Sequence, residues 1–218
     1  MSLYSNIQKI TTALSGSNCQ LIIVTKTKPI DTLQEVYDLG YKVFGENRVQ
    51  ELVEKYEALP KDIVWHLIGH LQTNKVKYIA PFVSLIHSVE SFKLLEEINK
   101  QAAKNNRVIN CLLQIYIAKE ETKFGLSEQE AIDILQLEEL NNLLNIKIIG
   151  VMGMATNTVD IEVVKNEFRT LKSFFDQIKF IQKPNVALTE ISMGMSGDYE
   201  LAAQAGSTMV RVGSAVFN

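Results

Sequence analysis

Lys26 is the residue of this chain best placed to act as a nucleophilic amine. It follows the apolar run Leu21-Ile22-Ile23-Val24, which is typical of a short strand buried on both faces in a parallel sheet. The carboxyl ends of such strands are where α/β folds bind ligands and carry out chemistry. An amine at that edge can form a Schiff base with a carbonyl group. The alternative is an ordinary solvated lysine at a strand end, since lysine is rarely buried without a partner.

Two loops near the end of the sequence have residues suited to holding a phosphate. Residues 193–198 read Met-Gly-Met-Ser-Gly-Asp, and Gly213-Ser214 follow a later expected strand. Glycines let the backbone approach a ligand closely, and Ser196 offers a hydroxyl at the mouth of a helix. Together these loops indicate a phosphorylated ligand, although each glycine could instead serve only the geometry of its turn.

Arg211 lies inside an expected strand, with Met209 and Gly213 on the same face. A permanent charge in that position needs a partner. Solvent or a carboxylate such as Glu190 is one alternative. If the face lines the interior of a closed barrel, the guanidinium enters the same end of the barrel as Lys26.

An amine, a phosphate cradle and an inward arginine together suggest pyridoxal 5'-phosphate (PLP). Lys26 would supply the Schiff-base amine, and Arg211 would lie at the pyridine nitrogen. A guanidinium has no acceptor and does not lose its proton, so it bonds to an unprotonated ring nitrogen. An unprotonated ring is a poorer electron sink, which argues against aminotransferase-like chemistry.

The elements that must position these residues alternate regularly along the chain. Apolar runs predict eight strands, at residues 21–24, 42–47, 63–69, 82–89, 108–117, 146–152, 187–192 and 208–212. Helical spacing predicts helices over 3–14, 31–40, 48–58, 73–79, 91–105 and 163–178, one beginning at Ser127, and one over 198–205. No helix is expected after the last strand.

This pattern favours a single α/β domain over residues 1–218, a (β/α)8 TIM barrel with an extra N-terminal helix. Closure would make the first and eighth strands neighbours and bring Lys26 and Arg211 together. The helix over 3–14 would then cover the outer position that the last strand leaves vacant. The main alternative is an open, doubly wound sheet.

Composition excludes several classes of function. The chain has 22 Lys and Arg against 25 Asp and Glu, a net charge of −3, without a basic stripe for nucleic acid. No apolar run approaches the roughly 18 residues of a membrane-spanning helix, and the N-terminus has no secretion-signal pattern, so we expect a cytoplasmic protein. The two cysteines lack metal spacing. His66, His70 and His87 favour structural or rim hydrogen bonds over a metal site.

Several motifs, in this order and spacing, resemble the pyridoxal phosphate homeostasis protein family, whose fold is similar to the barrel domain of alanine racemase. The resemblance covers nearly the whole chain. It rests on residues 24–29 (VTKTKP), 44–47 (FGEN), 65–75 (WHLIGHLQTNK), 150–152 (GVM), 192–196 (SMGMS) and 210–213 (VRVG). The loop at residues 119–125 departs from the family's more usual pattern.

The resemblance implies contacts with the cofactor, with Lys26 as the cofactor lysine, Arg211 at the pyridine nitrogen, Ser196, Gly213 and Ser214 near the phosphate, and Asn47 and Met152 lining the pocket. Without it, Glu46 and Asn47 fit equally a pocket or the start of the next helix.

The resemblance also implies a non-enzymatic role, namely carrying or buffering PLP and affecting amino-acid and keto-acid balance. PLP-dependent apo-enzymes are possible recipients, and we expect a monomer. The alternative is a PLP-dependent amino-acid racemase-type enzyme, and more remotely a Schiff-base aldolase. Alanine racemase needs a tyrosine from a carboxyl-terminal β-domain as its second base, and the sequence ends five residues after Gly213.

Overall fold

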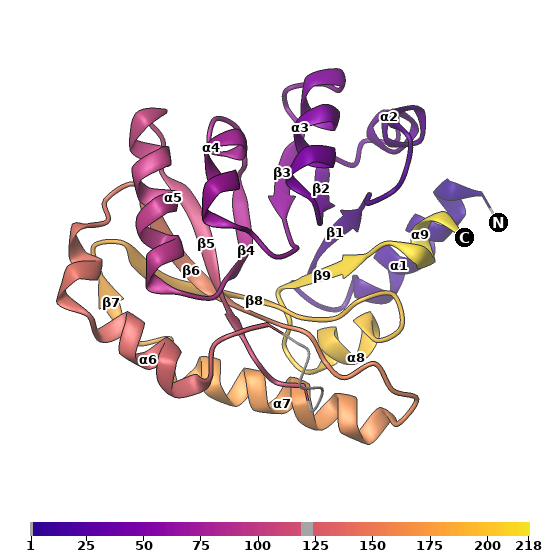
Figure 1. The fold of residues 1–218 in the computed structure, drawn as a ribbon. Coiled ribbons are helices and arrows are strands. Elements are labelled where there is room, and N and C mark those ends of the chain that lie inside the picture. The colour runs from indigo at the N-terminus through magenta and orange to yellow at the C-terminus, as the bar shows by residue number, and fades with distance from the viewer. Residues whose placement is uncertain (1, 119–123) are drawn as a thin grey trace.

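The computed structural model describes residues 2–118 and 124–218. Within these residues, eight parallel strands close into a barrel with helices around it (Figure 1). The strands of the barrel are β1 (Gln20–Val24), β2 (Val43–Glu46), β3 (Val64–Leu67), β4 (Leu85–Val89), β5 (Ile109–Ile115), β6 (Ile146–Gly153), β8 (Val186–Ser192) and β9 (Met209–Val212). Pairing of β6 with β8 completes the circle. The (β/α)8 barrel expected from the sequence is therefore confirmed.

The helices follow the predicted alternation closely. They are α1 (Leu3–Leu14), α2 (Ile30–Asp38), α3 (Val49–Ala58), α4 (Val76–Ile79), α5 (Phe92–Lys104), α6 (Glu128–Gln136), α7 (Ile161–Ile178), α8 (Tyr199–Gln204) and α9 (Ser214–Phe217). Ser127, where the sequence predicted a helix to begin, caps α6 in a capping box with Glu130. The helix α2 begins directly after Pro29 and has no side-chain cap.

Two apolar layers hold the barrel together. The larger layer lies between the strands and the helices and contains the outward side chains, among them Phe44 and Trp65. The smaller layer fills the barrel interior with Ile22, Leu85, Leu112, Met152 and Met209. Since strand side chains alternate, these inward residues fix which neighbours point into the barrel.

The C-terminal end differs from the sequence prediction. The last strand is followed by the four-residue helix α9, so the prediction of no helix there was wrong. The helix α1 lies beside the end of the last strand, as predicted. Asn6 of α1 donates from Nδ2 to the carbonyl oxygens of Val216 and Asn218 at 3.0 and 2.9 Å. Such a short final helix has no apolar period that a sequence could reveal.

Two further short elements were not predicted. The 3-10 helix η2 (Glu138–Asn142) follows α6, and the two-residue strand β7 (Gln182–Lys183) pairs antiparallel with β8. Another 3-10 turn, η1 (Thr73–Lys75), precedes α4 inside the predicted 73–79 helix.

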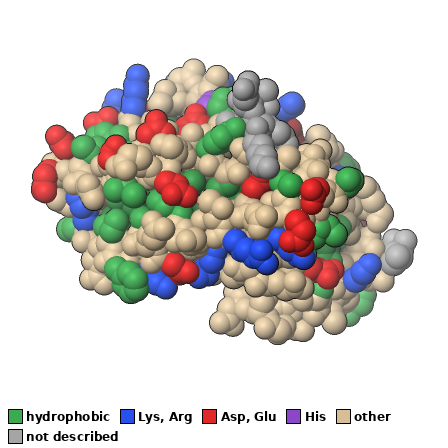
Figure 2. All heavy atoms as spheres, turned by 90° about the horizontal axis from the view of Figure 1, so that it is seen from below, with side chains coloured by type: hydrophobic (Ala, Val, Ile, Leu, Met, Phe, Trp, Pro, Cys, Tyr) green, Lys and Arg blue, Asp and Glu red, His purple; other side chains and the backbone are tan. Residues whose placement is uncertain are grey.

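None of the helices in the described parts of the chain combines the length and apolarity needed to span a membrane. Acidic and basic side chains are interspersed on the face seen in Figure 2.

Candidate functional site

Lys26 stands at the carboxyl end of the barrel, two residues after the end of β1. Its side chain is exposed, and the next residue, Thr27, has a φ of 61°. This left-handed conformation turns the chain sharply after the lysine. The amine is thus accessible at the edge where ligands bind in this fold.

The residue before the lysine is held by a buried ion pair. Lys55 of α3 donates from Nζ to Oε1 of Glu46 at 2.6 Å and to the carbonyl oxygen of Thr25 at 2.8 Å. The Thr25 hydroxyl also donates to Oε1 of Glu46. Both charged side chains are buried, and burial raises the pKa of Glu46 above its usual value. The pair lies outside the barrel wall, so Glu46 does not enter the barrel.

The residue after the lysine is held by the same helix. The backbone N–H of Thr27 donates to Oε2 of Glu51 at 2.9 Å, and Glu51 also lies 3.5 Å from Nζ of Lys55. Both neighbours of Lys26 are therefore tied to β2 and α3, while the side chain of Lys26 itself stays free to reach a ligand.

Arg211 of β9 points into the barrel, as predicted. Its guanidinium is buried and donates from Nη1 to Oγ of Ser192 at 2.6 Å and from Nη2 to the carbonyl oxygen of Gly153 at 3.0 Å. Among the described residues no carboxylate lies within 4.0 Å of it. Glu190 instead accepts from the hydroxyl of Thr208 at 2.6 Å. Burial lowers the pKa of Arg211 to about 10, which leaves it charged near neutral pH.

Two buried histidines continue the polar contacts of Arg211. Nδ1 of His87 lies 2.9 Å from Oγ of Ser192, and Nε2 of His87 lies 3.0 Å from Nδ1 of His66. Burial lowers the pKa of His66 to about 4 and that of His87 well below its usual value. Both rings are therefore neutral at neutral pH.

The two predicted phosphate loops meet at the carboxyl end of β9. Oγ of Ser196 accepts from the backbone N–H of Gly213 at 3.1 Å and of Ala215 at 3.3 Å. A Cβ at Gly213 would lie 3.1 Å from the carbonyl oxygen of Val24, so this loop passes close against the end of β1. Ser214, the first residue of α9, is exposed.

The remaining predicted residues lie around this centre. Met152 of β6 is fully buried in the interior apolar layer and is in register with Ser192. Asn47 follows β2, on the other side of β1, and is half-buried. A Cβ at Gly69 would lie 2.3 Å from the carbonyl oxygen of Asn47, so the backbone after β3 packs directly on it.

Contacts join Ser196 to Gly213, and the register places Arg211 beside β1. The first and last strands are paired, with Ile22 opposite Arg211 and Ile23 opposite Val212. Lys26, Arg211, Ser196 and the loop after β9 thus occupy adjoining strands of the same barrel end. Among the described residues, the side chain of Asn47 forms no hydrogen bond with them.

Sequence reasoning missed the role of Ser192 as the partner of Arg211. It also left His66 and His87 as unspecified structural histidines. The alternation of side chains along each strand contained the signal, because each of these side chains falls on an inward position. The inward face can be assigned only when the interior residues of every strand are known.

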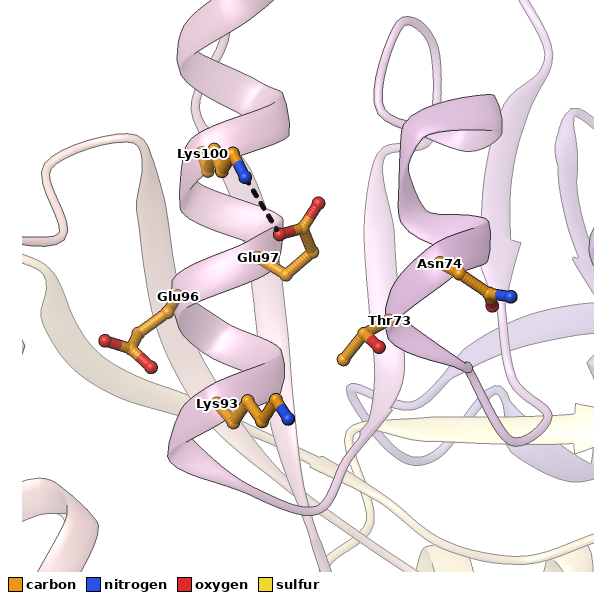
Figure 3. Close-up of a pocket in the computed structure, with 6 residues that line it drawn as sticks. All are labelled: Thr73, Asn74, Lys93, Glu96, Glu97 and Lys100. Atoms are coloured by element: carbon orange, nitrogen blue, oxygen red, sulfur yellow. Dashed lines mark ion pairs between the residues drawn. The ribbon is translucent and has the colours of Figure 1, made fainter.

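A surface pocket of about 450 Å³ lies elsewhere, between η1 and α5 (Figure 3). It is lined by Thr73, Asn74, Lys93, Glu96, Glu97 and Lys100. Lys100 and Glu97 form an ion pair at 3.7 Å on one helix. These side chains come from the outer helices and do not belong to the barrel end described above. The described residues also contain no cluster of three His, Cys, Asp or Glu side chains that could hold a metal.

Comparisons with known proteins agree with this architecture. The family model of the alanine racemase N-terminal domain matches residues 1–218. A pyridoxal phosphate homeostasis protein from Aquifex aeolicus is 43% identical over 204 residues, which cover 93% of this chain and 88% of that protein. Structures of PipY from Synechococcus elongatus, without PLP and with PLP bound, are each 32% identical, cover 100% of both chains, and have TM-scores of 0.92 and 0.87. This chain therefore belongs to the pyridoxal phosphate homeostasis protein family, which has the fold of the alanine racemase N-terminal domain.

Proposed function

We propose that residues 1–218 form one PLP-binding domain that holds the cofactor as a Schiff base with Lys26. In this proposal the protein serves intracellular PLP homeostasis and the balance of amino acids and keto acids, without catalytic turnover. The PLP-bound structure of PipY and the names of the curated relatives support the ligand and the role. The observation in this chain that carries the proposal is the buried guanidinium of Arg211.

The donors of Arg211 fit a pyridine nitrogen. A guanidinium has five N–H groups, and the hydrogen bonds described above account for one on Nη1 and one on Nη2. A buried cation without a carboxylate partner is costly unless a ligand supplies an acceptor. The lone pair of an unprotonated pyridine nitrogen is such an acceptor. Since Arg211 keeps its own proton near neutral pH, it would hold that nitrogen unprotonated.

The loops after β8 and β9 fit the phosphate. The backbone N–H groups of Gly213 and Ala215 donate to the Ser196 hydroxyl, and the N–H of Ser214 lies between them at the start of α9. In this proposal the phosphate replaces the hydroxyl as their acceptor. We propose that these groups bind the phosphate, and that Met152 and Asn47 line the remaining wall. A Cβ at Gly213 would make a tight contact of 3.1 Å with the carbonyl oxygen of Val24, so glycine is the residue that fits best where this loop passes β1.

Lys26 fits the role of the covalent attachment point. Its side chain is exposed, while Thr25 and Thr27 on either side are held by Lys55 and Glu51. When bound, PLP supplies an aldehyde that an amine can capture reversibly. Lys26 supplies that amine and, when displaced by another amine, a proton acceptor at Nζ. Arg211 orients the ring, and the loop donors orient the phosphate.

The proposal is tested directly by the cofactor content of the purified protein. We expect a yellow protein whose chromophore becomes fixed to Lys26 by borohydride, as peptide mass spectrometry would show. A colourless protein, even after incubation with excess PLP, contradicts the proposal. Incubation of the holoprotein with L- and D-alanine in deuterated water tests the absence of turnover. Rapid exchange of the α-proton with inversion would favour the racemase-type alternative.

We further propose that the protein is a monomer and passes PLP to PLP-dependent apo-enzymes. Transfer is measured by mixing the holoprotein with an apo-enzyme and following the enzyme's recovered activity, with an equal concentration of free PLP as the control. Faster activation by the holoprotein supports direct delivery. Activation no faster than the release of PLP into solution contradicts it. Sedimentation of the holoprotein gives its oligomeric state.

A further inference from the structure

A continuous chain of buried polar groups crosses the barrel interior beneath the proposed cofactor position. It runs from Arg211 on β9 through Ser192 on β8 and His87 on β4 to His66 on β3. The successive distances are 2.6 Å, 2.9 Å and 3.0 Å. All four side chains are buried, and Ser192 and His87 have no exposed surface.

Donor and acceptor requirements give this chain a direction. Arg211 can only donate, so Oγ of Ser192 accepts from it. Among the described residues, the only other hydrogen-bond partner of Oγ of Ser192 is Nδ1 of His87. The buried Ser192 hydroxyl therefore donates to Nδ1 of His87, because otherwise its proton would be buried without an acceptor.

The direction continues through both imidazoles. With Nδ1 of His87 as an acceptor, a neutral ring carries its proton on Nε2. That N–H donates to Nδ1 of His66, so His66 in turn carries its proton on Nε2. The low pKa values of both histidines agree with neutral rings. Of these four hydrogen-bonded side chains, Arg211 is then the only cation at neutral pH.

We propose that Ser192, His87 and His66 are positioning residues that lock the guanidinium of Arg211 into one orientation toward the ring nitrogen of PLP. This inference rests on the proposed function. Because the hydroxyl proton of Ser192 is committed to His87, its oxygen lone pairs always face Arg211. The Gly153 carbonyl holds Nη2 at the same time, so these two hydrogen bonds fix the orientation of the planar guanidinium and of its remaining N–H groups.

The direction of the chain is tested in the protein without PLP. Nitrogen-15 NMR of the imidazole rings assigns the tautomer of each histidine. We expect the proton on Nε2 of both His87 and His66. A proton on Nδ1 of His87 reverses the chain, leaves Ser192 free to rotate, and overturns the inference whether or not the protein binds PLP.

The effect on Arg211 is tested with matched serine variants. Ser192→Ala removes the acceptor of Arg211. Ser207→Ala removes another buried hydroxyl, on the segment between β8 and β9, which bonds to the backbone of Ile191, Met193 and Met209 and, among the described residues, forms no hydrogen bond with Arg211. We expect Ser192→Ala to weaken PLP binding about tenfold, as for loss of a hydrogen bond to a charged group. With nitrogen-15-labelled PLP, its ring nitrogen should also shift toward the protonated state. Ser207→Ala should leave the ring-nitrogen signal unchanged.

A second pair of variants tests the next link and does not depend on Ser192→Ala folding. His87→Asn places an amide oxygen near the position of Nδ1 and can still accept from Ser192, while His87→Leu cannot. We expect the ring-nitrogen signal of wild type in His87→Asn and a protonated signal in His87→Leu. Equal ring-nitrogen signals in all variants would overturn the inference. Failure of the wild-type protein to bind PLP at Lys26 would instead overturn the proposed function, so the two failures are distinguishable.

Discussion

Ile22 on the first strand of the barrel lies directly opposite Arg211 on the last strand. Lys26 follows Ile22 by four residues, so a lysine near the start of the chain and an arginine near its end share one edge of the molecule. The pairing of β1 with β9 depends on closure of the barrel, since in an open sheet these strands need not be neighbours.

The covalent role of Lys26 is tested by replacing each of two nearby lysines. Lys26→Ala should abolish the borohydride-fixed chromophore completely, because no amine remains at that position. Lys28→Ala is the matched control, since Nζ of Lys28 lies 5.0 Å from the centre of the Phe217 ring and is not proposed to carry the cofactor. It should remain yellow. Absorbance after dialysis and peptide mass spectrometry measure both; a chromophore retained by Lys26→Ala would disprove the assignment.

The ion pair of Glu46 and Lys55 is buried and should contribute strongly to stability. Lys55→Met leaves the Glu46 carboxylate buried without its cation, so it should lower the free energy of unfolding by about 3–5 kcal/mol. The double variant Glu46→Gln, Lys55→Met should recover much of that loss, because no uncompensated charge remains. Urea unfolding of the wild type, Glu46→Gln, Lys55→Met and the double variant gives the coupling energy.

An exposed pair provides the control for that cycle. Nζ of Lys165 lies 2.8 Å from Glu162, with the Glu162 side chain 67% exposed and that of Lys165 37% exposed. Breaking this pair with Lys165→Met should leave stability nearly unchanged, because solvent screens exposed charges. If Lys55→Met has as little effect as Lys165→Met, the buried pair does not hold the strand end that precedes Lys26.

The two neutral histidines should make stability depend on pH. Histidines of the unfolded chain take up protons near pH 6.5, whereas burial lowers the pKa of folded His66 to about 4 and that of folded His87 well below 6.5. The unfolded state therefore binds more protons in this window, and stability falls as pH is lowered through it. Each histidine contributes up to about 1.4 kcal/mol per pH unit.

Urea unfolding between pH 5 and pH 6.5, in the absence of PLP, measures this slope. His66→Gln removes one titrating group and should reduce the slope by up to about 1.4 kcal/mol per pH unit. An unchanged slope would show that folded His66 takes up its proton as readily as in the unfolded chain.

Closure of the barrel between β6 and β8 should tolerate no side chain at residue 150. A Cβ at Gly150 would lie 1.8 Å from the carbonyl oxygen of Glu190, which is its partner across that strand pair. Gly150→Ala should therefore destabilise the protein by about 3 kcal/mol or more. Gly16→Ala, with no atom within 4 Å of the added Cβ, should change stability by less than about 0.5 kcal/mol. Thermal unfolding of both variants makes the comparison, and a mild effect at Gly150 would contradict the closure described here.

The alternation of strands and helices could be read from the sequence because buried parallel strands are runs of apolar residues. Residues 21–24 and 146–152 are clear examples, and both became barrel strands. The two-residue β7 and four-residue α9 could not be read, since neither is long enough to show a period. Each of them forms against a longer element: β7 pairs with β8, and α9 is bonded by Asn6 of α1.

Parts of the site could be predicted where the residue type alone limits the chemistry. They could not be predicted where the role of a residue depends on which face of its strand it occupies. The sequence predicted the places of Lys26 and Arg211 at the barrel end. It treated Glu46 and Asn47 as one polar pair, although adjacent strand residues point to opposite faces and Glu46 turns outward to Lys55. The contact of His87 with Ser192 spans 105 residues, and no local pattern reports it.

The hydroxyl of Ser196 supports the loop after β9 from within the protein. It already satisfies the N–H groups of Gly213 and Ala215, which would otherwise be donors awaiting an anion. The shape of the loop after β9 is therefore set by hydrogen bonds within the protein itself.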